Sequence, residues 1–271
     1  MKIILPIKKY LFGLVIFIGL SNLAYSEEHK TLVDNNISTK CDIIDLKIPY
    51  SNENNLTFFN GKNAYDVDAY DTALKVLKPL AELGHKRAQT GMGLMYLYGD
   101  GLAKDEKKAI EWFKKASCQD HDWALYHLGT SYYYGRGVTK NYKLSFEYYQ
   151  KASLQNNASA FLALGHLYGS GRGVEKDNFI AIKNYKKALG LGEFDAAFFL
   201  GEIYYSGDQV VTDLVTALMW LNVADQSGDK AAYTFIEYLE NQLAIEDVLE
   251  AKEMADKCIS SGYTLCDVRR L

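Results

Sequence analysis

A sequence unit of 36 residues recurs four times and constrains the fold of this chain more than any other feature. Each copy begins at an alanine, continues to a leucine or methionine followed by glycine, and carries a tyrosine three residues after that glycine. The four glycines are Gly93, Gly129, Gly165 and Gly201. A period held over four copies is typical of solenoids, in which each repeat buries its apolar face against its neighbours.

Two helices are expected within each copy. The alanine, the Leu or Met four residues later and the tyrosine after four more lie on one stripe of a 3.6-residue helix. A Gly-x-Gly turn then ends this first helix, because glycine adopts positive φ at little cost. Gln209 replaces the second turn glycine in the fourth copy.

A short polar residue precedes each second helix and is expected to cap its free amides. The four caps are Asp105, Asn141, Asp177 and Asp213. On the inner face of the second helix we expect Trp112, Tyr148 and Trp220, and the third copy departs from this pattern with Asn184 followed by Tyr185. The predicted fold class is all-α, an α/α superhelical solenoid of antiparallel helix pairs.

Three further segments complete the predicted organisation. Residues 27–55 are polar and without lasting periodicity, and are expected to be a poorly ordered lead-in. Residues 56–271 form the solenoid, with a divergent opening repeat at 56–87, four full repeats at 88–229 and a degenerate C-terminal cap at 230–271. Terminal repeats of solenoids are usually atypical, because their outer face meets water.

Residues 1–26 have the composition of a signal peptide. Lys2, Lys8 and Lys9 precede an apolar run, and small residues follow, so cleavage is expected between Ser26 and Glu27. The alternative is an uncleaved anchor, but the run is shorter than the roughly 20 residues that a spanning helix needs. The sequence therefore predicts a periplasmic or secreted protein without an integral membrane segment after cleavage.

The charge of the mature chain argues against two classes of partner. Without the three leader lysines it has 27 basic and 34 acidic residues, a net charge of −7. No basic stripe is present, so nucleic acid and anionic membrane are not expected as partners.

The residues of the four copies resemble the Sel1-like repeat, a relative of the tetratricopeptide repeat. The copies contain AQTGMGLMYLYGDGL, ALYHLGTSYYYGRGV, AFLALGHLYGSGRGV and AAFFLGEIYYSGDQV. The resemblance covers about residues 56–266. It implies a right-handed superhelix that acts as a protein–protein adaptor.

The spacing of Cys258 and Cys266 is similar to that in the cysteine-rich Sel1-like proteins of bacteria. This resemblance implies a disulfide between the two, which an exported location allows. Free thiols are the alternative. Whether Cys41 and Cys118 pair with each other, with a partner or not at all is left open by the sequence.

By analogy with tetratricopeptide repeats, four positions of each first helix line a concave groove that binds a protein or peptide. The expected groove residues are Thr90, Leu94, Leu97, Tyr98, Tyr126, Thr130, Tyr133, Tyr134, Leu162, His166, Phe198, Glu202 and Tyr205. Such an apolar, tyrosine-rich surface suits a protein interface. The alternative is that several of these side chains only pack between repeats.

Catalytic motifs are nearly absent. The sequence has no G-x-S-x-G, H-E-x-x-H, C-x-x-C or phosphate loop, its five histidines are scattered, and neither a metal nor a cofactor is expected. Ser227-Gly-Asp-Lys230 matches the S-x-x-K motif of penicillin-binding proteins and β-lactamases, but S-D-N and K-T-G are missing. A cell-envelope enzyme of this type therefore remains an alternative to the adaptor.

A second alternative is an adaptor of a eukaryotic secretory compartment. Asn36, Asn55 and Asn157 each stand in a glycosylation sequon, although an asparagine-rich chain produces such sequons by chance. The sequence does not name the partner in any of these cases.

Overall fold

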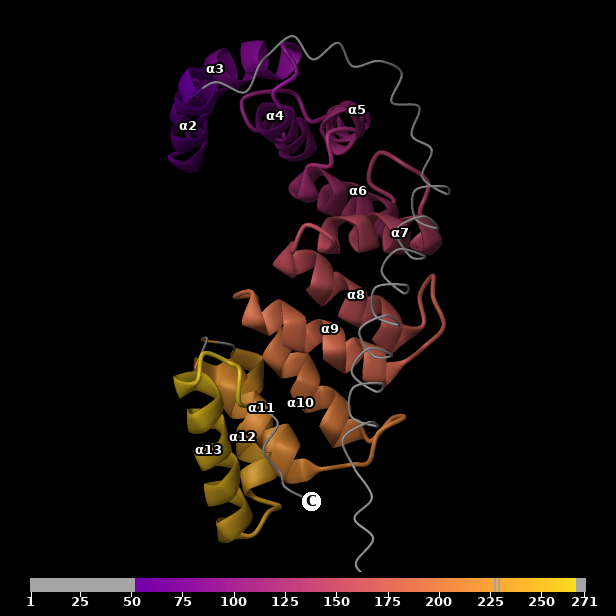
Figure 1. Cartoon of the computed structure of the whole chain (residues 1–271), viewed down its shortest axis with the longest axis vertical. Coiled ribbons are helices and arrows are strands. Elements are labelled where there is room, and N and C mark those ends of the chain that lie inside the picture. The colour runs from indigo at the N-terminus through magenta and orange to yellow at the C-terminus, as the bar shows by residue number, and fades with distance from the viewer. Residues whose placement is uncertain (1–51, 227, 229, 267–271) are drawn as a thin grey trace, which may run out of the picture. The chain divides into compact units, whose positions relative to one another are not determined.

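The computed structural model describes residues 52–266 except 227 and 229, all within one compact unit, Asp42–Leu271. Twelve α-helices and no strand are present in this part of the chain (Figure 1). They are α2 (Asn52–Asp66), α3 (Tyr70–Glu82), α4 (Lys86–Tyr98), α5 (Glu106–Ser117), α6 (Asp122–Tyr134), α7 (Tyr142–Ser153), α8 (Ala158–Ser170), α9 (Asn178–Gly190), α10 (Ala196–Ser206), α11 (Leu214–Gln226), α12 (Lys230–Glu240) and α13 (Ile245–Ser260). The expected leader and most of the lead-in lie outside the described residues.

Helices α2 to α11 pack as five successive pairs, and the second helix of each pair also contacts the first helix of the next. This arrangement confirms the predicted α/α solenoid. The opening pair begins earlier than expected, because α2 starts at Asn52 and not at residue 56. Pro79 lies inside α3, three residues before its last residue.

A glycine in each first helix lets the paired second helix approach closely. A Cβ atom added to Gly129 would lie 2.6 Å from Cδ1 of Tyr149, which is closer than real Cβ atoms come to another heavy atom. The corresponding residues opposite Gly93, Gly165 and Gly201 are Phe113, Tyr185 and Leu221. The side chain against the glycine is therefore one position later than the expected Trp112, Tyr148 and Trp220.

Tyr148 and Trp220 are nevertheless buried, whereas Trp112 is half-buried beneath the ammonium group of Lys115, 4.1 Å from its ring centre. In the third copy Tyr185 packs against Gly165, just as Tyr149 packs against Gly129 in the second copy. The residues that face the glycines are therefore spaced by 36 residues. The third copy therefore follows the period.

The predicted helix caps are confirmed. The side chains of Asp105, Asn141, Asp177 and Asp213 accept hydrogen bonds from the amides of Lys108, Leu144, Ile180 and Thr216. The first turn glycine of each copy adopts the left-handed conformation and ends the preceding helix. Both signals are local, which explains why the sequence predicts these boundaries closely.

The second turn glycine joins one repeat to the repeat before it. A Cβ atom on Gly137 would collide with the carbonyl of Glu106, and one on Gly173 with the carbonyl of Tyr142. Each of these carbonyls belongs to the first residue of the second helix of the preceding repeat. The backbone of the turn therefore contacts the backbone of the preceding repeat, and the second turn position leaves no space for a side chain.

Gln209 shows how the fourth repeat manages without this glycine. It keeps a positive φ of 59°. Its Oε1 accepts a hydrogen bond from the amide of Asn178, at 2.8 Å, at the first residue of α9. The glutamine side chain therefore replaces close backbone contact with a polar contact at the same junction.

The C-terminal end departs from the regular pairing, because α13 packs against α11. Only four residues, 241–244, join α12 to α13, whereas seven residues join the two helices in each of the four full repeats. Val248, Ala251 and Met254 of α13 are buried in the same apolar cluster as Trp220 of α11. The last helix therefore covers the end of the apolar core.

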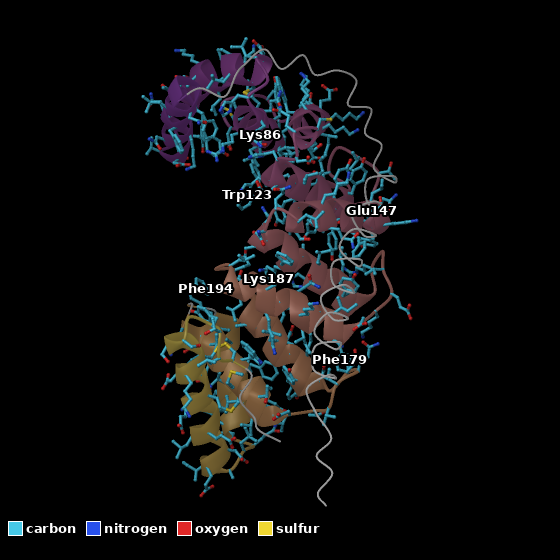
Figure 2. The ribbon with its side chains drawn as sticks, viewed as in Figure 1. Lys86, Trp123, Glu147, Phe179, Lys187 and Phe194 are labelled. Atoms are coloured by element: carbon cyan, nitrogen blue, oxygen red, sulfur yellow. A yellow bond between two sulfur atoms is a disulfide. The ribbon has the colours of Figure 1, made fainter. Side chains whose placement is uncertain are left out.

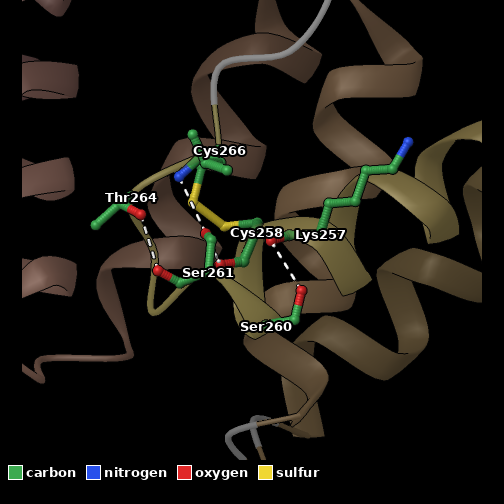
Figure 3. Close-up of a disulfide and its surroundings, with 7 residues drawn as sticks. Lys257, Cys258, Ser260, Ser261, Thr264 and Cys266 are labelled. Atoms are coloured by element: carbon green, nitrogen blue, oxygen red, sulfur yellow. Dashed lines mark hydrogen bonds between the residues drawn. A yellow bond between two sulfur atoms is a disulfide. The ribbon is translucent and has the colours of Figure 1, made fainter.

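Cys258 and Cys266 are joined by a disulfide in the structure (Figure 3), with their Cα atoms 4.4 Å apart. The turn between them is also held by Ser261, whose hydroxyl donates to the Cys258 carbonyl at 2.7 Å. The ring of Tyr263 in this turn lies 5.4 Å from that of Phe194, between α9 and α10. The bridge thus holds the end of the described chain against the solenoid.

Replacing both Cys258 and Cys266 by serine is expected to lower the free energy of unfolding by about 2–3 kcal/mol, because the bridge closes a short loop in the unfolded chain. Urea denaturation of the parent and the variant measures the difference. Mass analysis of the parent after alkylation without reductant is the control. Alkylation of Cys258 and Cys266 would contradict the bridge.

Candidate functional site

All thirteen expected groove residues lie on the first helices of the repeats, and the structure gathers nine of them around two cavities on neighbouring helices. Lys86, Trp123 and Phe194 lie along one side of the helix stack, whereas Glu147 and Phe179 lie along the other (Figure 2). We call the two cavities the N-terminal cavity and the tyrosine cavity, and define each by its residues below.

The N-terminal cavity lies among α2, α4 and α6 and has a volume of about 870 Å³. Phe58, Phe59, Tyr65, Tyr98, Trp123 and His127 supply its aromatic lining. Of the expected groove residues, Thr90, Leu94 and Tyr98 line it. Thr90 is almost fully buried, and its hydroxyl lies 2.9 Å from Nδ1 of His121.

Three large aromatic side chains of this cavity are unusually exposed. Phe59 is 45% exposed, Tyr98 58% and Trp123 47%. Each comes from a different helix, and all three line the same cavity. Single exposed apolar residues are common on protein surfaces, but a group around one concavity is typical of an interaction site.

Charged groups also line the N-terminal cavity. Lys86 and Arg87 occupy the first turn of α4, and neither makes an ion pair with another described residue. Lys62 is paired with Asp66. These contacts leave two cationic side chains of α4 available beside the exposed aromatic rings.

Two further carboxylates belong to this cavity. Asp122 accepts a hydrogen bond from the side-chain amide of Asn157 at 3.0 Å. Asp120 is exposed, and no ion pair to it exists within the described part of the chain. The lining of the cavity therefore holds three cationic side chains and three carboxylates.

The tyrosine cavity lies between α6 and α8, has a volume of about 300 Å³ and also receives Tyr149 of α7. Six expected groove residues line it, namely Tyr126, Thr130, Tyr133, Tyr134, Leu162 and His166. Its lining contains no lysine, arginine, aspartate or glutamate. It therefore offers ring faces and hydroxyl groups.

An aromatic cluster connects the two cavities. The ring centre of Tyr126, in the tyrosine cavity, lies 5.8 Å from that of Trp123 and 5.3 Å from that of His127, both in the N-terminal cavity. All three residues belong to the first half of α6. The two cavities therefore lie next to each other along one face of the repeats.

Four expected groove residues line neither cavity. Leu97 is only 5% exposed and belongs to the buried interior. Phe198, Glu202 and Tyr205 lie on α10, where Tyr205 packs edge-to-face against Phe235 of α12. Nine of the expected groove residues therefore line cavities at α4, α6 and α8, and those of α10 line neither cavity.

The sequence reasoning missed the contribution of α2 and of Trp123. Phe58 and Phe59 were assigned to the opening repeat without a role at a site, because that repeat lacks the glycine and tyrosine landmarks. Trp123 precedes the alanine from which the groove offsets are counted. Their aromatic character was the available signal, since aromatic side chains dominate the energetics of protein cores and interfaces.

Burial keeps the histidines of this region neutral. Desolvation lowers the pKa of His121 to about 4, although the Asp122 carboxylate opposes this shift, while Lys86, Arg87 and His85 add to it. Desolvation also lowers the pKa of His127 to about 4. His127 stacks on Phe113 with ring centres 5.1 Å apart, so it behaves as an aromatic packing residue.

Residues 52–266, leaving aside 227 and 229, contain no cluster of three metal-ligating side chains. Ser227, the first residue of the S-x-x-K match, lies outside the described residues. Asn157, one of the sequon residues, is buried, and its Oδ1 caps α8 by accepting from the Ala160 amide. Its side chain is thus fully engaged in the folded protein.

The sequence was compared with models of protein families. The model described as the Sel1 repeat matches residues 86–121, 124–157, 158–193 and 194–224, just over half of the chain. This chain belongs to the Sel1 repeat family. Members of the family generally serve as scaffolds for protein–protein interaction. No curated protein is similar enough in sequence to serve as a relative.

Solved structures agree with this assignment. A Sel1 repeat protein from Oxalobacter formigenes is 30% identical, with a TM-score of 0.65 over 74% of this chain and 84% of that one. The protective antigen c5321 of uropathogenic Escherichia coli is 26% identical, with a TM-score of 0.63 over 78% of this chain. The match spans 46% of the antigen's own length.

A third relative shares the fold alone. The immunity protein Pa5087 from Pseudomonas aeruginosa is 20% identical, with a TM-score of 0.50 over 82% of this chain and 85% of that one. Within the part of the Sel1 repeat chain that the structure describes, no helix has the length and apolar character required to cross a membrane.

Proposed function

We propose that this protein is an exported, non-enzymatic scaffold that binds an extended segment of a partner protein along the surface formed by α2, α4, α6 and α8. The observation that carries the proposal is the pair of adjacent cavities, joined through the aromatic rings of Trp123, Tyr126 and His127. Aromatic anchors in pockets contribute most of the binding free energy at many protein interfaces.

The shape of the surface favours a polypeptide over a compact small ligand. The cavities are arranged in sequence along neighbouring repeats, so that an extended segment contacts both at once. Tyrosine hydroxyls at the tyrosine cavity would form hydrogen bonds with backbone groups of the bound segment, because a tyrosine presents an apolar ring and a hydrogen-bonding tip. No cofactor and no nucleic acid has a part in this binding.

The proposal of export rests on residues 1–26 and on the disulfide. A basic start, an apolar run and small residues before Glu27 form the pattern that signal peptidase recognises. The bridge between Cys258 and Cys266 is compatible with an oxidising compartment. A mature protein that begins at Glu27 in the periplasm or medium, as read by intact mass, is the expected result, and a cytoplasmic full-length protein would contradict it.

Photo-crosslinking tests the binding surface. A photoreactive phenylalanine analogue at Tyr134 (58% exposed, in the tyrosine cavity) is expected to crosslink the partner in an extract of the producing cells. The matched control carries the same analogue at Phe179, 65% exposed on the other side of the stack. Crosslinking at Phe179 and not at Tyr134 would contradict the proposed surface.

A set of variants provides a second readout. Replacing Tyr98, Trp123 and Tyr134 by serine removes exposed rings without emptying the core, so the variant should stay folded and lose at least about tenfold in affinity. The control replaces Phe179 and Val211, which is 86% exposed, by serine. Circular dichroism confirms the fold of both variants, and equal retention of the partner by both would contradict the proposal.

A further inference from the structure

We infer that Cys41 and Cys118 form a second disulfide, which ties the segment before α2 to the junction between α5 and α6. Such a bridge needs no partner protein and therefore goes beyond the proposed function. It follows from the bonded state of Cys118, from the number of cysteines in the chain and from the position of Cys118 beside the N-terminal cavity.

The partner of Cys118 is identified by elimination. The chain has four cysteines, and Cys258 and Cys266 are bonded to each other. Cys118 is also disulfide-bonded, and none of the described cysteines is a free thiol. Cys41 lies outside the described residues and is the one cysteine of the chain that is left to pair with Cys118.

The junction between α5 and α6 gives Cys118 a rigid anchor. Cys118 directly follows the last residue of α5 and is half-buried. The next residue, Gln119, donates hydrogen bonds from its side-chain amide to the carbonyl of Gly84 and to Oε1 of Gln89, both at 2.9 Å. Gly84 and Gln89 belong to the preceding turn and to α4, so these bonds fix the junction against its neighbour.

The chain before α2 is long enough to reach this anchor. Ten residues, 42–51, separate Cys41 from the first residue of α2. Ten extended residues span up to about 33–36 Å. Only α3 and α4 lie between α2 and α5 in the series of packed helices. Because packed helices lie about 8–10 Å apart, three such spacings take at most about 30 Å.

The bridge would connect two different walls of the N-terminal cavity. Helix α2 supplies Phe58 and Phe59 to one wall, and Asp120 and His121, which follow Cys118 closely, belong to another. As the first helix of the described solenoid, α2 lies in a terminal repeat, and terminal repeats open more readily than internal ones. The loop closed by the bridge contains α2 to α5, so their unfolding gains less entropy. We therefore expect the bridge to hold the α2 wall in place.

Formation of the bridge consumes one disulfide of an oxidant, which is either a thiol–disulfide oxidoreductase or oxidised glutathione. One cysteine thiolate attacks the oxidant and forms a mixed disulfide, with release of the first thiol. The second cysteine thiolate then attacks the mixed disulfide and releases the second thiol. Two protons and two electrons pass from Cys41 and Cys118 to the oxidant, and an oxidising compartment regenerates it.

Peptide mapping tests the pairing directly. Protein produced from the complete sequence is incubated with oxidised glutathione, so that the result does not depend on export. It is then alkylated and digested with trypsin without reductant. Cleavage after lysine and arginine places Cys41 in peptide 41–47, Cys118 in peptide 116–136 and the other two cysteines together in peptide 258–269. The expected product is peptide 41–47 joined to peptide 116–136, from protein with the intact mass of one chain.

Three outcomes of this mapping would overturn the inference. The first is recovery of peptides 41–47 and 116–136 separately, each alkylated or carrying glutathione. The second is a link from either of them to peptide 258–269. The third is a link found only in protein with the mass of two chains, since that bridge would join two copies.

Limited proteolysis tests the effect on α2. The rate of tryptic cleavage after Lys62, an exposed residue of α2, is expected to rise at least about tenfold when Cys41→Ser is combined with Cys118→Ser. The matched control, Cys258→Ser with Cys266→Ser, removes the other bridge and should change this rate less than about twofold, because the two sites are distant. Equal rates in the parent and in Cys41→Ser/Cys118→Ser would show that the bridge does not hold α2 and would overturn the inference.

Both tests are independent of partner binding. Neither uses a partner protein, so loss of crosslinking at Tyr134 together with joined peptides 41–47 and 116–136 would contradict the proposed function and support the bridge. Intact crosslinking at Tyr134 with separate peptides would support the proposed function and overturn the bridge.

Discussion

Replacing Gly173 by alanine is expected to lower the free energy of unfolding by about 2–5 kcal/mol. The new methyl group would lie less than 3.0 Å from backbone atoms of Tyr142 and Lys143, and the backbone at residue 173 has a φ of +74°. Overpacking of this kind costs typically about 1–3 kcal/mol, and a left-handed alanine adds roughly 1–2 kcal/mol. Neither obstacle is relieved by a side-chain rotation, since backbone atoms create both.

The matched control is Gly192→Ala. Gly192 also has a positive φ, +94°, but an added Cβ meets no heavy atom within 4 Å. This variant should lose only the backbone contribution, roughly 1–2 kcal/mol. Urea denaturation followed by circular dichroism measures both variants, and equal losses would show that contact between repeats at Gly173 has no special weight.

The stability of the protein is expected to fall when the pH decreases from 7.5 to 5.0. His121 and His127 have a pKa of about 4 in the folded protein, against 6.5 in the unfolded chain. The unfolded state therefore binds more protons between these values, so the stability that the neutral histidines contribute is complete above pH 6.5 and is lost as the pH falls toward 4. Each contributes about 2 kcal/mol of this loss at pH 5.

His127→Phe isolates one half of this effect. Phenylalanine keeps the stacking on Phe113 and does not titrate. The variant's loss of stability between pH 7.5 and 5.0 should be smaller than that of the parent by about 2 kcal/mol, whatever its stability at pH 7.5. Because each protein is compared with itself at two pH values, a packing change cancels. An identical pH dependence in parent and variant would contradict the assigned pKa of His127.

The elements that the sequence predicts well are those fixed by local chemistry. The αL glycines Gly99, Gly135 and Gly171 and the polar caps that follow them depend on a few neighbouring atoms. The same pattern of turn glycine and polar cap occurs in four copies, which strengthens the prediction for each copy. The period of 36 residues therefore predicts the helix pairs and their order.

The features that the sequence did not predict depend on contacts between distant segments. The packing of α13 against α11 covers the open end of the apolar core, which is not a property of the repeat. The residue that faces each glycine also differs from expectation, because Phe113 and Tyr149 follow the more conspicuous Trp112 and Tyr148. The size of a side chain alone did not indicate which residue of the second helix faces the glycine.

The same distinction applies to the candidate site. Offsets within a repeat predicted nine residues that line the two cavities, because equivalent positions of successive helices lie side by side. The α2 wall and Trp123 break the repeat pattern, so offsets did not include them.

The emission of Trp123 tests the central claim most directly. The chain has three tryptophans, and replacing Trp112 and Trp220 by phenylalanine leaves Trp123 as the sole reporter at the N-terminal cavity. The partner protein is the one identified by crosslinking at Tyr134. At saturation with this partner, the Trp123 emission should shift to shorter wavelength, because binding removes the exposed indole from water. An unchanged Trp123 spectrum at saturation, with binding confirmed by anisotropy, would contradict binding along this surface.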